Sequence, residues 1–166
     1  MAKKVSIYGL LTALAFVLNY IEMLIPLSSI MYGMKIGLAN IVVLAAFYLL
    51  DYKGAFIISI IRIILAGITF GNMSTLIYSL AGGMLAYTLM ALAKKSGLFG
   101  IQGVSIIGGV AHNTGQLIVA VIVLETKGIL LYAPFLFIVG AVAGLINGII
   151  GGKIVERADV MKGQNS

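Results

Sequence analysis

Residues 129–152 read ILLYAPFLFIVGAVAGLINGIIGG and contain no charged side chain. A helix rises about 1.5 Å per residue, so this stretch is long enough to cross the roughly 30 Å hydrocarbon core of a bilayer. Lipid offers backbone groups no hydrogen-bond partners, which leaves helices or closed barrels as spanning structures. The alternation of apolar and polar residues that a barrel strand needs is absent here. The stretch therefore predicts a transmembrane helix.

Five further apolar runs precede this stretch, and polar or glycine-containing breaks separate them. They cover residues 5–25, 36–50, 55–70, 76–93 and 104–124. Hydrophobic residues make up 61% of the chain and charged residues 10%, whereas soluble domains are about a quarter charged. We expect an all-α membrane protein with a six-transmembrane-helix bundle in residues 1–152, followed by a polar cytoplasmic tail in residues 153–166.

The basic residues between the runs predict the orientation of the bundle. With six spans, eight of them fall on one side of the membrane: Lys3, Lys4, Lys53, Lys94, Lys95, Lys153, Arg157 and Lys162. Only Lys35 and Lys127 fall on the other side. Because loops rich in Lys and Arg stay in the cytoplasm, we expect a multi-pass protein of the cell membrane with both termini cytoplasmic. The net charge of +6 is explained by this topology, and no basic block indicates a nucleic-acid partner.

Small residues recur at four-residue spacing in several runs, which places them on one face of a helix. Gly140, Gly144, Gly148 and Gly152 follow this pattern in the last run, and it favours close packing of helices within the bundle. Gly9 and Ala13 repeat the spacing in the first run. There, a contact with a separate subunit and packing within the bundle remain equally open.

Arg62 lies in the middle of the third run, flanked by isoleucines on both sides. A charged side chain at this depth is costly, so it should face the bundle interior. Two interpretations remain open. Arg62 binds a structural partner, such as Glu22 or backbone carbonyls, or it binds an anionic ligand through its planar fork of donors.

A second polar group, His112, Asn113 and Gln116, lies in the middle of the fifth run. His112 and Gln116 are four residues apart and therefore share one helical face. The chain has a single histidine and no cysteine, so we expect no metal site. These three polar side chains are more typical of the wall of a polar cavity than of simple helix packing.

The remaining polar candidates lie where the predicted topology places the outer half of the membrane. They are Asn19, Glu22, Lys35, Asn40, Tyr78 and Ser79. Together with the mid-depth groups, they predict a cavity that opens to the outside and is covered by residues 26–35. The positive charge of this set favours a small anionic or amphipathic molecule as ligand, with Glu22 orienting Arg62 or Lys35. We expect no cofactor.

Several classes of activity are excluded by what the sequence lacks. It contains no phosphate-binding loop for ATP hydrolysis. Its only aspartates are Asp51 and Asp159, so a paired aspartate motif for magnesium-diphosphate chemistry cannot form. No Ser-His-acid or two-carboxylate arrangement is present, and we therefore predict that the chain is not an enzyme and has no catalytic residues.

Four strings together resemble a known family of membrane proteins. They are GMKIGLAN (33–40), RIILAGITFG (62–71), YSLAGG (78–83) and the segment from GVS (103–105) to HNTGQ (112–116). They resemble the proteins described as heptaprenyl diphosphate synthase component I, also called Gx transporters. The resemblance extends over residues 9–152, which is nearly the whole chain.

This family is similar to the substrate-binding S components of energy-coupling-factor (ECF) vitamin importers. The resemblance implies a six-helix S-component fold with an outward-facing cavity for a vitamin-, flavin-, quinone- or isoprenoid-related metabolite. It also implies a T subunit and two cytoplasmic ATPases as partners. S components often contact the T subunit through an Ala-x-x-x-Ala face on the first helix, and Gly9-x-x-x-Ala13 departs from that pattern. The alternatives are a non-catalytic membrane component of heptaprenyl diphosphate synthesis and a stand-alone dimeric transporter.

Overall fold

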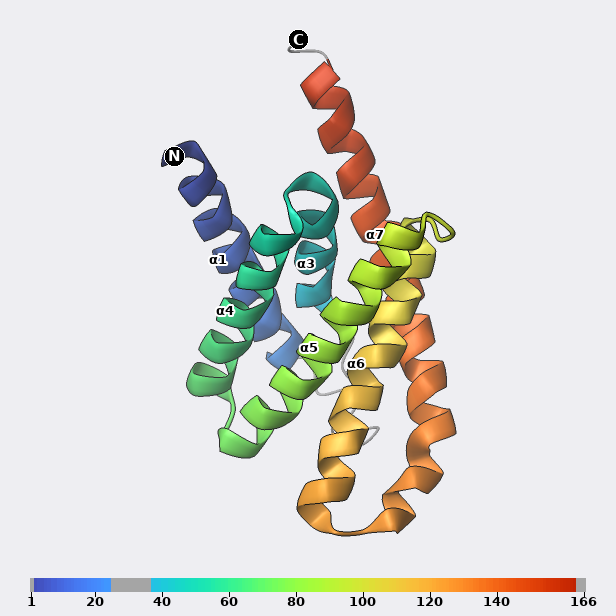
Figure 1. The fold of residues 1–166 in the computed structure, drawn as a ribbon. Coiled ribbons are helices and arrows are strands. Elements are labelled where there is room, and N and C mark those ends of the chain that lie inside the picture. The colour runs from blue at the N-terminus through green and yellow to red at the C-terminus, as the bar shows by residue number, and fades with distance from the viewer. Residues whose placement is uncertain (1, 25–36, 164–166) are drawn as a thin grey trace.

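A computed structural model describes residues 2–24 and 37–163, and all the regular structure in these ranges is helical. The elements are α1 (Ala2–Leu24), α3 (Leu38–Leu49), α4 (Tyr52–Phe70), α5 (Met73–Ser96), α6 (Ile101–Leu124), the 3-10 helix η1 (Lys127–Tyr132) and α7 (Ala133–Gly163). The predicted all-α class is confirmed. Figure 1 shows that the beginning of α1, the end of α7 and the α3–α4 turn lie at one end of the bundle, which we call the terminal end.

Within the described ranges, five helical segments are long and apolar enough to cross a bilayer, namely α1, α4, α5, α6 and the η1–α7 segment. Helix α3 is also apolar but has 12 residues. Large apolar side chains on the outside are exposed, for example Ile68 (73%), Leu10 (70%) and Ile122 (68%). An exterior this apolar fits contact with hydrocarbon and not with water. The chain is therefore a multi-pass membrane protein, with five long candidate spans and one short apolar helix.

Helix α3 is the centre of the bundle, because it is buried nearly all the way round. Its run from Ile41 to Phe47 is continuously buried. The helix packs against α1, α4 and α7. A helix that is hydrophobic on every face requires such complete cover, and at about 1.5 Å per residue its 12 residues span about 18 Å.

The predicted glycine face of the last helix packs inside the bundle, against α6. A Cβ atom at Gly144 would lie 2.6 Å from the carbonyl oxygen of Ser105, and one at Gly140 would lie 2.7 Å from that of Gly109. At Gly148 it would lie 2.8 Å from the Cα atom of Gln102. These neighbours are backbone atoms, so the two main chains touch directly.

The predicted ends of several helices were wrong by a few residues. Helix α5 begins at Met73 and not at residue 76, because the Asn72 side chain caps it by accepting a hydrogen bond from the Thr75 amide (2.8 Å). Helix α6 begins at Ile101 and not at residue 104. Helix α7 continues to Gly163, so the predicted boundary at residue 152 does not coincide with a helix end.

Lys94 joins α5 to the end of α3 near the terminal end. Its Nζ donates a hydrogen bond to the carbonyl oxygen of Phe47 (2.6 Å), which belongs to the last turn of α3. The same ammonium lies 4.3 Å from the ring centroid of Tyr48 and 5.1 Å from that of Tyr52. Carbonyls in the last turn have no partner within the helix, and a cation there stabilises the helix end.

Replacing Lys94 with methionine is expected to lower the free energy of unfolding by about 1–2 kcal/mol, because a charged hydrogen bond and cation–π contacts are lost together. The neighbouring Lys95 is exposed, and its replacement with methionine is the matched control. Thermal unfolding in detergent measures both variants. Equal melting temperatures for the two would show that the Lys94 contacts do not stabilise the bundle.

Candidate functional site

A cavity of about 240 Å³ lies among the helices, and α1, α3, α4, α5, α6 and α7 all contribute to its wall. Its polar lining residues are Asn19, Glu22, Asn40, Ser59, Arg62, Thr75, Ser79, Ser105, His112, Asn113, Gln116 and Asn147. Such a concentration of polar groups in an apolar bundle marks a functional site by default. Most of the residues that the sequence singled out are brought together here.

Small residues make up much of the cavity wall. Glycines from four helices line it, among them Gly67, Gly83, Gly108 and Gly140, and Ala86 and Ala143 add to them. A Cβ atom at Gly83, Gly108 or Gly140 would clash with Ile63, Met90 or the Gly109 backbone, so these glycines allow the walls to pack closely. The volume lies just below the range of about 300–1,000 Å³ that is typical of pockets for small molecules.

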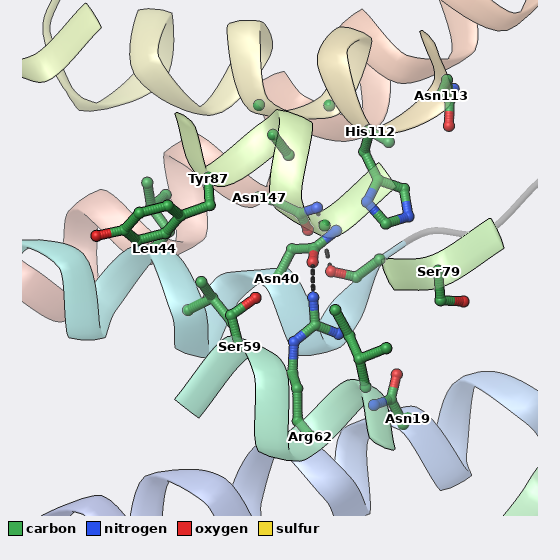
Figure 2. A pocket seen from close by; sticks show the side chains of 18 of the residues that line it. Asn19, Asn40, Leu44, Ser59, Arg62, Ser79, Tyr87, His112, Asn113 and Asn147 are labelled. Carbon is green, nitrogen blue, oxygen red and sulfur yellow. Dashed lines mark hydrogen bonds between the residues drawn. The ribbon is translucent and has the colours of Figure 1, made fainter. Parts of the chain in front are cut away.

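Arg62 is the cationic side chain of the described cavity wall. Its side chain is 7% exposed, and its Nη2 donates a hydrogen bond to Oδ1 of Asn40 (2.5 Å; Figure 2). The Nε atom is buried and has no hydrogen-bond partner. Burying a charge is costly unless it is paired and its donors are satisfied. Arg62 therefore retains the capacity to bind an acceptor.

Glu22 acts on Arg62 through its charge and not through a direct hydrogen bond, because the two opposite charges attract each other across the cavity. Its Oε1 accepts a hydrogen bond from the amide of Gly37 (2.5 Å), while Nδ2 of Asn147 donates to the carbonyl of the same glycine (3.2 Å). Gly37 has a φ of 72°, and a Cβ atom there would lie 2.7 Å from Nδ2 of Asn40. Helices α1 and α7 thus hold the beginning of α3 and position Asn40 for Arg62.

Helix α6 contributes the wall opposite Arg62. The imidazole of His112 points into the cavity from this side (Figure 2). Asn113 also lines the cavity, but its Nδ2 donates to the carbonyl of Leu136 on α7 (2.7 Å). Gln116 lies one turn further along α6 than His112. His112 and Gln116 therefore face the cavity as their spacing predicts, while Asn113 also ties α6 to α7.

Some of the predicted residues lie elsewhere. Tyr78 is half-buried and does not belong to the described cavity lining, whereas the adjacent Ser79 does. Lys35 and the predicted cover, residues 26–35, lie outside the described residues. Gly9 and Ala13 are exposed on α1, and no atom lies within 4 Å of a Cβ built at Gly9. The α1 face that carries these two residues is therefore open at this point.

Sequence reasoning left three buried polar residues out of the site, namely Ser59, Ser105 and Asn147. Spacing contains a signal for all three. Ser59 precedes Arg62 by three residues, and Asn147 follows Gly144 by three, so each shares a helical face with a residue already recognised as inward-facing. Ser105 precedes His112 by seven residues, or two turns, and shares its face in the same way.

The fold and the cavity define a polytopic α-helical membrane protein with a polar, arginine-containing hollow inside its helix bundle. The family described as heptaprenyl diphosphate synthase component I matches residues 11–154, and the chain belongs to this family. The resemblance seen in the sequence is thereby confirmed. A search of curated proteins and a search of solved structures found no match.

Proposed function

We propose that the chain is a substrate-capture subunit that binds a small anionic metabolite inside the membrane, as the S component of an ECF-type importer. The observation that carries this proposal is the buried Arg62 guanidinium in the cavity wall, one of whose N–H groups has no acceptor. Guanidinium presents five donors in a planar fork, which matches carboxylate and phosphate oxygens. A bound anion would supply the acceptor that the protein lacks.

The neighbouring side chains suit recognition of a polar ligand. His112 and Gln116 reach the cavity from α6, and Asn19 reaches it from α1 with an Nδ2 atom that is buried and has no partner. Amide and imidazole groups donate and accept hydrogen bonds, so they discriminate among anions of similar charge. The site would therefore bind one metabolite in preference to inorganic anions.

The distribution of charge supports uptake from outside. Lys53 and Lys95, together with Lys153 and Arg157, lie on segments near the terminal end, which the positive-inside rule places in the cytoplasm. Glu22 and Ser79 lie on the part of the cavity nearer the opposite end. In this orientation the polar part of the cavity faces the outside of the cell.

Transport by such a subunit requires an external source of energy. The sequence has no phosphate-binding loop, so the chain does not itself hydrolyse ATP. We propose that a T subunit with two cytoplasmic ATPases supplies this energy. The exposed α1 face at Gly9 and Ala13 is the candidate docking surface, because small residues allow another helix to approach closely.

The family description favours a second candidate function, a non-catalytic membrane component of heptaprenyl diphosphate synthesis. The chain's two aspartates, Asp51 and Asp159, are far apart in sequence and do not form an aspartate-rich motif. In this case a separate soluble synthase would perform the chemistry, and the membrane subunit would hold it at the bilayer.

Purification of the tagged chain in mild detergent, followed by mass spectrometry of proteins and small molecules, tests these proposals. We expect a T subunit, two ATPases and one anionic metabolite to co-purify. A soluble prenyl synthase in place of the ATPases would support the second function and contradict import. Transport into liposomes that contain the chain alone would indicate a stand-alone transporter and overturn the need for ATPases.

A further inference from the structure

The cavity is polar at one end and largely apolar at the other. Towards the end of the bundle opposite the termini, its wall carries Asn19, Glu22, Thr75 and Ser79. Figure 2 shows Ser79 and Asn113 on one side of the cavity and Leu44 and Tyr87 on the other, with Asn40 and Arg62 between them. The polar groups are therefore not spread evenly along the hollow.

The other end of the cavity, nearer the terminal end, is formed mainly by hydrocarbon. Leu44 and Phe47 from α3 meet Ala86 and Met90 from α5. The ring of Tyr87 also lines this part, but its hydroxyl donates to the backbone carbonyl of Tyr52 (2.8 Å). Ser59 and Ser105 are the polar side chains at this level. The lining at this end carries no charged side chain, and the Lys94 ammonium, 5.3 Å from the centroid of the Phe47 ring, lies outside it.

We propose that the ligand is an amphipathic anion, with one carboxylate or phosphate group at Arg62 and a short apolar body that points towards Phe47 and Met90. This inference rests on the proposed capture function. It adds that the ligand has an anionic head group and an apolar body, and it gives the orientation of the ligand in the bundle. The anion satisfies the guanidinium, and the apolar body fills the end whose lining carries no charged side chain.

The size of the cavity limits the apolar body. A volume of about 240 Å³ lies below the range of about 300–1,000 Å³ of pockets that enclose drug-sized molecules. A chain of seven isoprene units is longer than such molecules and does not fit inside. A single ring or a short branched chain has dimensions that suit this volume.

A homologous series of probes tests the two-part ligand. Straight-chain monocarboxylates from acetate to decanoate are titrated into the full chain in nanodiscs, and saturable binding is measured by calorimetry. Each buried methylene contributes about 0.8 kcal/mol, so affinity should rise about fourfold per carbon until the apolar end is full. A matched series of alkylammonium ions should show no saturable binding, because Arg62 repels them.

Ala86→Leu is the decisive variant, since the added side chain occupies the apolar end of the cavity. We expect it to lower affinity for the longer carboxylates at least tenfold and to leave acetate unchanged. Thr88→Leu, on the exposed face of the same helix, is the control and should behave as wild type. Partition of the probes into lipid is the same for all variants, so only differences between variants count.

The possible results separate this inference from the proposed function. Carboxylate binding that is lost in Arg62→Gln but independent of chain length and of Ala86 would overturn the two-part ligand and leave capture of an anion intact. Absence of any carboxylate or phosphate binding that depends on Arg62 would overturn both. A parallel series of monoalkyl phosphates distinguishes a carboxylate head group from a phosphate.

Discussion

Gly144→Leu is expected to prevent assembly of the folded bundle. A Cβ atom at Gly144 would lie 2.6 Å from the carbonyl oxygen of Ser105 and 2.7 Å from the Cα atom of Ile106. Both neighbours are backbone atoms in the first two turns of α6, so neither can rotate away as a side chain would. Overpacking typically costs about 1–3 kcal/mol even where side chains yield, and we expect at least the upper value here.

The measurement is the fraction of protein that elutes as a single species in detergent size-exclusion chromatography. Gly152→Leu is the matched control on the same helix, because the nearest atoms around a Cβ at Gly152 are side-chain atoms of Ile101 and Gln102 at 3.8 and 3.9 Å. It should elute like wild type. A Gly144→Leu protein that is equally well folded would mean that α6 and α7 do not touch as described.

Arg62→Met is expected to weaken ligand binding at least about 30-fold while the bundle stays folded. Removing one partner of a buried charge pair costs about 2–5 kcal/mol, and each 1.4 kcal/mol is a factor of ten in affinity. Methionine resembles the arginine stem in shape and needs no solvation, so the helix still packs. The loss of a donor to Oδ1 of Asn40 costs about 1–3 kcal/mol of stability.

Two further variants sharpen this test. Arg62→Lys keeps the charge but loses the planar fork, so it should bind more weakly than wild type and more tightly than Arg62→Met. Arg157→Met removes an exposed arginine at the end of α7 and should change neither binding nor melting temperature. The readout is the amount of small molecule that co-purifies. Unchanged binding in Arg62→Met would make Arg62 a structural residue and end the capture proposal.

Much of the fold follows from the sequence, because hydrocarbon leaves the backbone few options. Apolar runs of bilayer length had to be helices, and the long ones are. The ends were less predictable, since capping residues such as Asn72 are polar and look like loop. Helix α3 was predicted as a span of residues 36–50, and its described helical part, Leu38–Leu49, is shorter and serves as the buried centre.

The sequence predicted those site residues whose polar side chains are costly to expose to lipid. Arg62 and His112 cannot face lipid cheaply, so both had to point inward, and both line one cavity. Hydrogen-bond partners were not predictable in this way. The acceptor for Gly37 could have been any nearby carboxylate or amide, and only the packing of α1 against α3 makes it Glu22. Tyr78 was misplaced because adjacent residues on a helix point about 100° apart.

The direct contact between the main chains of α6 and α7 limits how the cavity can change its volume. Helix α5 meets α6 in the same way, because Cβ atoms at Gly82 and Gly115 would lie 2.7 Å from the carbonyl oxygens of His112 and Ala81. Main chains have no rotamers to exchange, so α5, α6 and α7 form one rigid unit. The side chains of Leu44 and Ile63 lie between this unit and α3 or α4, and they are able to repack. A conformational change that admits or releases a ligand therefore has to come from α1, α3 and α4.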